Sequence, residues 1–222
     1  MNYVAVIGDV KESKKINERF MVQEKLSQVL KHVNEKYEYD ISAKFIITLG
    51  DEFQGLLENS KHLLDIIQYI QREMYPIKLR FGVGIGEIHT NILPEAAIGA
   101  DGPAYYAARK TIEELREQEK KLKKQAPDVQ VSVYKQERFE VAEINIILTF
   151  MKLTEESWSE KQRYTIWDML LNGGSQEECA RRLDTTQSTV ARRLAEGNMV
   201  TYCKAKDTVD EALNRLEELL LD

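Results

Sequence analysis

The stretches Val4-Ala5-Val6-Ile7-Gly8-Asp9 and Lys44-Phe45-Ile46-Ile47-Thr48-Leu49-Gly50-Asp51-Glu52-Phe53 decide the fold prediction. Each is a short apolar run that gives way to a loop or turn at an acidic residue, a pattern typical of buried strands. If the two strands pair, Asp9 and Asp51 converge at one edge of a sheet. Mg²⁺ commonly takes one or two protein carboxylates and completes its shell with water and substrate phosphates. This edge is therefore a candidate metal site.

Strand and helix patterns alternate over the first 150 residues. The expected elements are a strand at 3–8, a helix at 14–36, a hairpin at 43–57, a helix at 60–74 and a strand at 77–86. This β-α-β-β-α-β order predicts an α/β fold of the ferredoxin-like, palm type. A helix that opens at Pro103, a strand at 129–134 and a helix at 138–152 are expected to follow.

Composition changes near residues 153–158, after which the chain reads as helical throughout. We therefore expect two domains, a palm over 1–153 and an all-α module over 154–222. Within the module, 174–194 has the pattern of two short helices joined by a turn. Small Ala180 permits a close helix crossing, and Thr186 is placed to cap the second helix.

Where two such helices bind DNA, the N-terminal residues of the second helix contact base edges. The second helix here therefore carries the candidate DNA contacts. Those residues are Gln187, Ser188, Thr189, Arg192 and Arg193. Between Ser175 and Lys206 six basic and four acidic residues give a local charge of +2 (six minus four), against −6 for the whole chain. This asymmetry favours a nucleic-acid partner for the module, while the alternative is a helical module that packs on the palm or mediates dimers.

Composition limits the remaining function classes. No apolar stretch approaches the length of a membrane span, and the N-terminus enters a strand without an export pattern. The two cysteines, Cys179 and Cys203, are too few for a disulfide framework. We expect a cytoplasmic protein with no membrane partner.

The motifs resemble those of nucleotide cyclases. The run Asp9-Val-Lys-Glu-Ser-Lys-Lys-Ile16-Asn17 with Gly50-Asp-Glu-Phe53 resembles the diguanylate-cyclase (GGDEF) pattern, and its 42-residue separation is similar to that of class III nucleotidyl cyclases. Arg80-Phe-Gly-Val-Gly-Ile-Gly86 followed by Gly102-Pro-Ala-Tyr105-Tyr-Ala-Ala-Arg109 resembles the class III Arg-Gly strand and Asn-x-x-x-Arg helix. A palm with a short helical tail resembles the SatD family of bacterial proteins, and the tail resembles the helix-turn-helix of bacterial regulators.

This resemblance implies roles for individual residues. Asp9 and Asp51 become candidate ligands of Mg or Mn, and Glu52 joins them through the diguanylate-cyclase motif alone. Arg109 would meet phosphate charge, for which its planar fork is suited. Tyr105 stands where the class III helix has Asn, and Ile47 stands where the cyclases have a purine-reading Lys.

Each residue also has a structural alternative. Asp9 is also placed to cap a helix, and Gly50-Asp51 to form an ordinary hairpin turn. Arg109 is also placed to form a surface ion pair with Glu113. The interior glycines Gly82, Gly84 and Gly86 indicate close approach either by a ligand or by a packed helix.

The predicted function is a cytoplasmic regulator whose palm binds a nucleotide or other phosphate ligand through Mg²⁺ and whose module binds DNA. The alternatives are an active two-metal nucleotidyl cyclase or transferase, and a non-enzymatic interaction protein. The sequence leaves open whether the protein catalyses a reaction. The last helix has an apolar stripe at Val209, Leu213, Leu216 and Leu220, which is expected to bury within the chain or to help form a homodimer.

Overall fold

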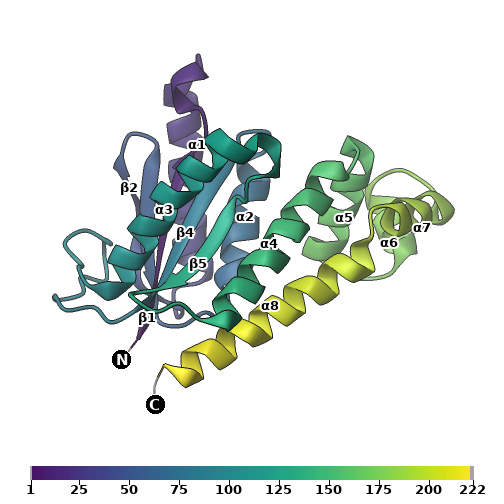
Figure 1. Cartoon of the computed structure of the whole chain (residues 1–222). Coiled ribbons are helices and arrows are strands. Elements are labelled where there is room, and N and C mark those ends of the chain that lie inside the picture. The colour runs from purple at the N-terminus through teal and green to yellow at the C-terminus, as the bar shows by residue number, and fades with distance from the viewer. Residues whose placement is uncertain (1, 221–222) are drawn as a thin grey trace.

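The computed structural model describes residues 2–220 (Figure 1). Its elements are β1 (Tyr3–Val10), the 3-10 turn η1 (Ser13–Lys15), α1 (Arg19–Lys36), β2 (Ile41–Leu49), β3 (Glu52–Leu57), α2 (Leu63–Met74), β4 (Leu79–Gly86), α3 (Pro103–Leu122), the 3-10 turn η2 (Lys123–Gln125) and β5 (Val129–Val133), followed by α4 (Phe139–Ser157), α5 (Glu160–Asn172), α6 (Gln176–Arg182), α7 (Gln187–Glu196) and α8 (Met199–Leu219).

The five strands form one sheet in the order β2-β3-β1-β4-β5. β1 is antiparallel to both β3 and β4, and β2 is antiparallel to β3. With α1 and α2 as the two crossovers, this is the ferredoxin-like arrangement, and the predicted fold class is confirmed. β5 is added at the edge, parallel to β4, through the crossover helix α3.

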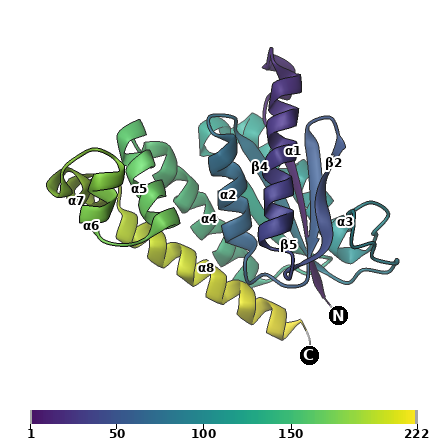
Figure 2. The same ribbon diagram turned by 180° about the vertical axis from the view of Figure 1, so that it is seen from behind.

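Helices cover both faces of this sheet. α1 and α2 lie side by side on one face (Figure 2), and α3 packs against β1, β4 and β5 on the other. The alternation of β1 sorts its side chains between the faces: Val6 and Val10 join the core with α1 and α2, whereas Ala5 and Ile7 join the core under α3. Full burial of a Val or Ile side chain contributes about 1.5–3 kcal/mol, so both faces hold the fold together.

The glycines of β4 bring α3 close to the sheet. A Cβ at Gly82 would lie 2.5 Å from the carbonyl oxygen of Ala108, and one at Gly84 would lie 2.0 Å from that of Ala104. At Gly86 the nearest atoms, from the start of α3, would be 3.1 Å away. Of the two interpretations of these glycines, close approach of a packed helix therefore applies at Gly82 and Gly84, where α3 backbone atoms lie nearest. A ligand-binding role for the three glycines stays a prediction.

The C-terminal helices continue the α1/α2 core. α4 packs on β5 and α8 packs on α4, and Trp158 and Ile166 belong to the same apolar cluster as the palm strands. Val209, Leu213 and Leu216 of α8 are fully buried within the chain. α4 runs without a break through residue 153, and the division of the chain there stays a prediction.

Side-chain caps fix the starts of three of these helices. Ser159 opens α5 and Ser175 opens α6, each through a reciprocal capping box with the residue three positions on. Thr186 accepts the backbone N–H of Thr189 at 3.2 Å and so caps α7, as the sequence predicts. Between residues 2 and 220, no helix combines the length and the apolar character needed to cross a bilayer.

Candidate functional site

Asp9 and Glu52 lie opposite each other in the β1–β3 ladder, on the face of the sheet that α3 covers. Both are buried, with 3% and 8% of their surfaces exposed. Carboxylates this buried require charged or hydrogen-bonding partners. Their partners define the site.

Two arginines hold Asp9. Its Oδ2 atom accepts from Arg80 Nη1 at 2.9 Å, from Arg116 Nε at 2.9 Å and from Arg116 Nη2 at 2.6 Å. The other oxygen, Oδ1, is buried and has no hydrogen-bond partner among the described residues. Burial raises the pKa of Asp9, although Arg80 and Arg116 act in the opposite direction. Asp9 is thus a carboxyl group whose ionised form depends on its arginine partners.

Glu52 is bound by the arginines of α3. Its Oε1 accepts from Arg109 Nη1 at 2.6 Å, and its Oε2 lies 3.4 Å from Arg116 Nη2. Arg109 therefore forms an ion pair, as one interpretation of the sequence proposes. Its partner is Glu52 of β3, beneath α3, and not Glu113. Arg80 also bonds Glu119 through Nη2 at 2.6 Å, which extends the cluster along α3.

Glu52, and not Asp51, is the residue that pairs with Asp9 in the ladder. That Asp9 and Asp51 hold a metal together stays a prediction. Asp51 sits in the tight turn before β3, where its carbonyl accepts the N–H of Val10 at 3.0 Å. Because successive residues of a strand point to opposite faces, Glu52 joins Asp9 while Asp51 turns toward the α1 face. There it lines a cavity of about 260 Å³ with Ser13, Lys14 and Arg19.

The donor set around Asp9 does not suit the two-metal centre that the cyclase resemblance implies. A cation at Asp9 and Glu52 would stand beside the guanidinium groups of Arg80, Arg109 and Arg116. Two like charges about 4 Å apart repel by roughly 4 kcal/mol at an effective dielectric constant of 20. In the part of the chain that the structure describes, no three His, Cys, Asp or Glu side chains come together to hold a metal.

Tyr105 is buried in the apolar cluster beneath α3, with 6% of its surface exposed. Its hydroxyl lacks a hydrogen-bond partner within residues 2–220. Burial raises the pKa of this phenol, so the group stays protonated. Tyr105 is placed as a packing residue at the start of α3, and its predicted catalytic role stays a prediction.

Sequence reasoning did not single out Arg80 or Arg116 as site residues. Arg80 is a charged residue at the start of an otherwise apolar strand, which predicts a buried charge with a partner. In the structure it is 9% exposed. Arg116 follows Arg109 by two helical turns and so lies on the same face of α3. These two signals are visible in the sequence.

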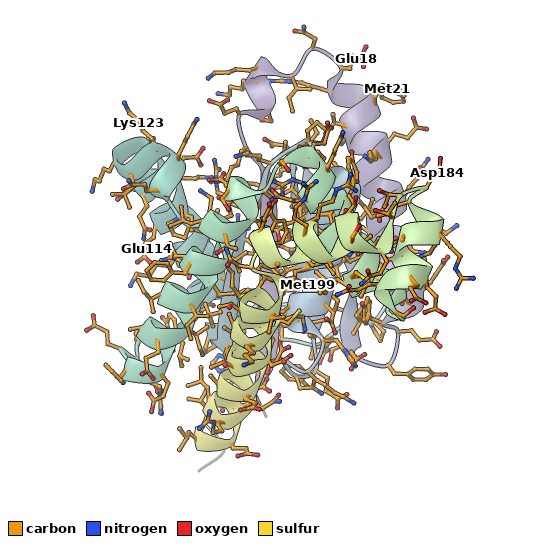
Figure 3. All side chains as sticks on the ribbon, turned by 90° about the vertical axis from the view of Figure 1, so that its right-hand side faces the viewer. Glu18, Met21, Glu114, Lys123, Asp184 and Met199 are labelled. Carbon is orange, nitrogen blue, oxygen red and sulfur yellow. The ribbon has the colours of Figure 1, made fainter. Side chains whose placement is uncertain are left out.

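A second candidate surface lies at the end of the molecule farthest from the sheet, where α6 and α7 are joined by a turn that contains Asp184 (Figures 1 and 3). Ala180, Val190 and Leu194 are buried within it. Gln187, Ser188 and Arg192 are exposed on α7, and Thr189 is partly exposed.

The two neighbouring arginines of α7 differ. Arg193 turns inward and donates to the hydroxyl of Thr165 at 3.3 Å, so it is a poorer candidate for contact with a partner than Arg192. On α6, Arg182 holds Asp168 through Nε at 3.0 Å and Nη2 at 2.7 Å. The outward cations of this end are therefore Arg181 and Arg192, both exposed.

The chain is a palm-type α/β protein with C-terminal helices, in which a carboxylate on β1 pairs with one on β3. This chain belongs to the SatD family, whose model matches residues 3–213. A search of curated proteins finds none that matches the sequence.

Several solved structures are similar in part. A bacterial light-regulated adenylyl cyclase is 10% identical, with 59% of this chain and 75% of that chain covered at a TM-score of 0.42. A dimeric guanylyl cyclase domain from the fungus Blastocladiella emersonii is 12% identical, with 49% and 71% covered at 0.38. A regulator of polyketide synthase expression from Bifidobacterium adolescentis is 14% identical, with 98% and 86% covered at 0.28. Likenesses this weak establish nothing about the activity of this chain.

Proposed function

We propose that this SatD-family protein is a DNA-binding regulator whose cyclase-like palm binds a phosphate-bearing ligand, such as a nucleotide. The α6–α7 pair acts as a helix-turn-helix, and α7 enters the major groove. Gln187, Ser188 and Thr189 face the bases, while Arg181 and Arg192 face phosphates. Ligand binding to the palm biases the position of the helices and is read as a change in DNA affinity.

The observation that carries the DNA-binding role is the exposed first turn of α7. Thr186 caps this turn, and no palm element covers Gln187 or Ser188, which are both exposed. In a helix-turn-helix the N-terminal residues of the second helix contact base edges. Arg192 lies one turn further along the same helix, where an exposed guanidinium can reach the DNA backbone.

Selection from a random duplex library tests this half of the proposal. The wild-type chain should enrich a defined sequence, and Gln187→Ala should lose preference at a base position at a cost of about 1–3 kcal/mol. Lys161→Ala, which removes an exposed cation of α5, is the matched control and should enrich the same sequence. Recovery of no sequence above the starting library by the wild type would contradict the proposal.

The cavity beside Asp51 is the proposed site for the phosphate ligand. It is about 260 Å³, and its charged lining residues are Lys14, Arg19 and Asp51. The two cations outnumber the single acid, which favours an anion. Arg19 Nε donates to the carbonyl of Ser13 at 2.9 Å, which holds the guanidinium against the loop. Mg²⁺ carried by the phosphates would need only one protein carboxylate, and Asp51 is placed to supply it.

Thermal unfolding with nucleoside triphosphates, with and without Mg²⁺ or Mn²⁺, tests the palm site. At about 100 times its dissociation constant a ligand stabilises the native state by roughly 2.7 kcal/mol. Asp51→Asn should abolish the metal-dependent part of the shift, whereas Asp101→Asn, an exposed carboxylate outside the cavity, should not. A metal-dependent shift that survives Asp51→Asn and disappears in Asp9→Asn would instead favour a cyclase-type centre.

A homodimer fits this function because palindromic DNA sites match two-fold symmetric proteins. α4 offers an exposed apolar stripe, with Phe139, Ile146 and Phe150 exposed by 75%, 54% and 62%. Light scattering should report twice the mass of the 25.7 kDa chain, and Phe150→Glu should return it to one chain. Phe20→Glu, at another exposed aromatic residue, on α1, is the control and should leave the dimer intact.

A further inference from the structure

A pocket of about 330 Å³ lies where the palm meets the C-terminal helices. Gln71 of α2 and Tyr75 at its end form the palm side, while Glu155 of α4 and Arg163 and Trp167 of α5 form the other side. We call it the seam pocket. Its volume is in the range of small-molecule sites, which occur preferentially where two parts of a protein meet.

Aromatic rings surround the guanidinium of Arg163. It lies 5.1 Å from the ring centre of Tyr75 and 5.5 Å from that of Trp167. The Tyr75 and Trp167 rings meet edge to face with their centres 5.3 Å apart. Such rings offer flat surfaces to a planar ligand, and an arginine beside them offers charge and paired donors.

Arg163 keeps bonding capacity unused. Its Nη2 donates to the carbonyl of Glu155 at 2.6 Å, but its Nε is buried and lacks a partner among the described residues. A buried donor left unpaired costs free energy. An acceptor from a ligand in the pocket would remove that cost.

The other charges of the seam pocket favour an anion. Lys78 and Lys152 share a single acid, Glu156, at 2.5 and 2.8 Å. Glu155 accepts a hydrogen bond from the hydroxyl of Tyr202, and burial raises the pKa of its carboxyl. The lining holds four cations, Lys78, Lys124, Lys152 and Arg163, against three acids, Asp128, Glu155 and Glu156.

We propose that the seam pocket binds a small planar aromatic anion, packed against the Tyr75 and Trp167 pair with its acidic group on Arg163. This goes beyond the proposed function, because it assigns a second ligand site away from the Asp51 cavity. α5 supplies Arg163 and Trp167 to the pocket and also packs against α7.

Calorimetric titration of the full chain with naphthalene-2-sulfonate and with its neutral sulfonamide tests the proposal. The sulfonate should bind with one-to-one stoichiometry and at least about tenfold more tightly than the sulfonamide, since hydrogen bonds to charged groups are the strong ones. Arg163→Gln should weaken the sulfonate by about tenfold and leave the sulfonamide unchanged. Trp167→Ala should weaken both probes.

Arg215→Gln, which removes an exposed guanidinium of α8 outside the pocket, is the matched control and should bind both probes as the wild type does. Arg163→Lys, which keeps the charge, serves if Arg163→Gln unfolds, and it should retain part of the preference for the sulfonate. Equal binding of the two probes, an Arg163→Gln affinity equal to wild type, or no saturable binding up to about 1 mM would each overturn the proposal. DNA selection by the same variants separates this outcome from failure of the proposed function.

Discussion

Helices α3 and α7 both carry arginines, but they use them in opposite ways. On α3, Arg109 and Arg116 point into the sheet and bind Glu52 and Asp9. On α7, Arg192 points to solvent at the end of the molecule. In the palm Arg109 and Arg116 hold α3 to the sheet, whereas Arg192 of α7 is exposed.

Residues that resemble a known site can serve the fold instead. Asp9, which the cyclase resemblance implies as a metal ligand, is bound in this structure by the guanidinium groups of Arg80 and Arg116. Charge that is already paired and buried contributes to the fold. Exposed charge beside the capped start of α7 is what the proposed contact with nucleic acid rests on.

Loss of a buried arginine should have the largest effect on stability. Arg80→Met removes one of the two arginines that hold Asp9 and the guanidinium that binds Glu119. It should cost about 3 kcal/mol, the lower end for a broken buried ion pair, because Arg116 still holds Asp9. Urea denaturation measures it. Arg192→Met should stay within about 0.5 kcal/mol of wild type. Equal losses for the two variants would contradict the comparison.

A methyl group between α3 and the sheet should rank next. Gly84→Ala places a Cβ 2.0 Å from the Ala104 carbonyl oxygen, so the helix must move, at a cost of about 2 kcal/mol. Gly86→Ala meets its nearest atoms at 3.1 Å and should cost less. Thermal unfolding of both variants gives the order. A Gly84→Ala chain as stable as wild type would show that α3 packs less closely than described.

The cap of α7 should contribute about 1 kcal/mol. Thr186→Ala removes the hydroxyl that accepts the N–H of Thr189, which typically destabilises a helix start by that amount. Hydrogen exchange should become faster at the first amides of α7 and stay unchanged in α3. Thr201→Ala, at an exposed position inside α8, is the control. Unchanged exchange in α7 would remove Thr186 from its proposed role.

The smallest expected effect concerns how the free energy of unfolding depends on pH, with opposite signs for Asp168 in the C-terminal helices and Asp9 in the palm. Arg182 lowers the pKa of Asp168 below 3.8, so this pair stabilises the fold above that pH and loses its effect as the pH falls through the folded-state pKa. Asp168→Asn should cost about 0.5–1 kcal/mol at neutral pH and nothing in acid.

Asp9 should behave in the reverse sense, because burial raises its pKa above 3.8. Its contribution is most favourable below 3.8 and is lost as the pH rises through the folded-state pKa. Relative to wild type, Asp9→Asn should therefore become less destabilising with rising pH. Denaturation of both variants between acid and neutral pH measures the two slopes. Slopes of the same sign would contradict the contrast.

Sequence periodicity predicted the palm because each strand and helix of it buries a regular face. The order β-α-β-β-α-β and the close approach at Gly82 and Gly84 follow from local patterns. The sequence did not reveal whether a ligand or a helix makes that approach, and the structure shows that α3 does. The break at residue 153 was placed by composition, and α4 passes through it. Composition does not reveal whether a polar stretch is a linker or the exposed side of a helix.

The pairing of the acidic residues could not be predicted in the same way. Asp9 meets Arg116 across 107 positions of sequence, and only the packing of α3 brings them together. The register of β1 and β3 pairs Asp9 with Glu52 and not with Asp51. A change of register by one residue would reverse the faces, and the hydrophobic pattern near the turn does not specify it. The capping of α7 by Thr186 was predictable because it is local.

The salt dependence of DNA binding tests the central claim most directly. Fluorescence anisotropy with the selected duplex gives the slope of log K against log salt for wild type, Arg192→Gln and Arg109→Gln. Each phosphate contact contributes about one unit of slope. The account predicts that Arg192→Gln lowers the slope by about one and that Arg109→Gln leaves it unchanged. Equal slopes for all three proteins, or no binding at about 50 mM salt, would contradict it.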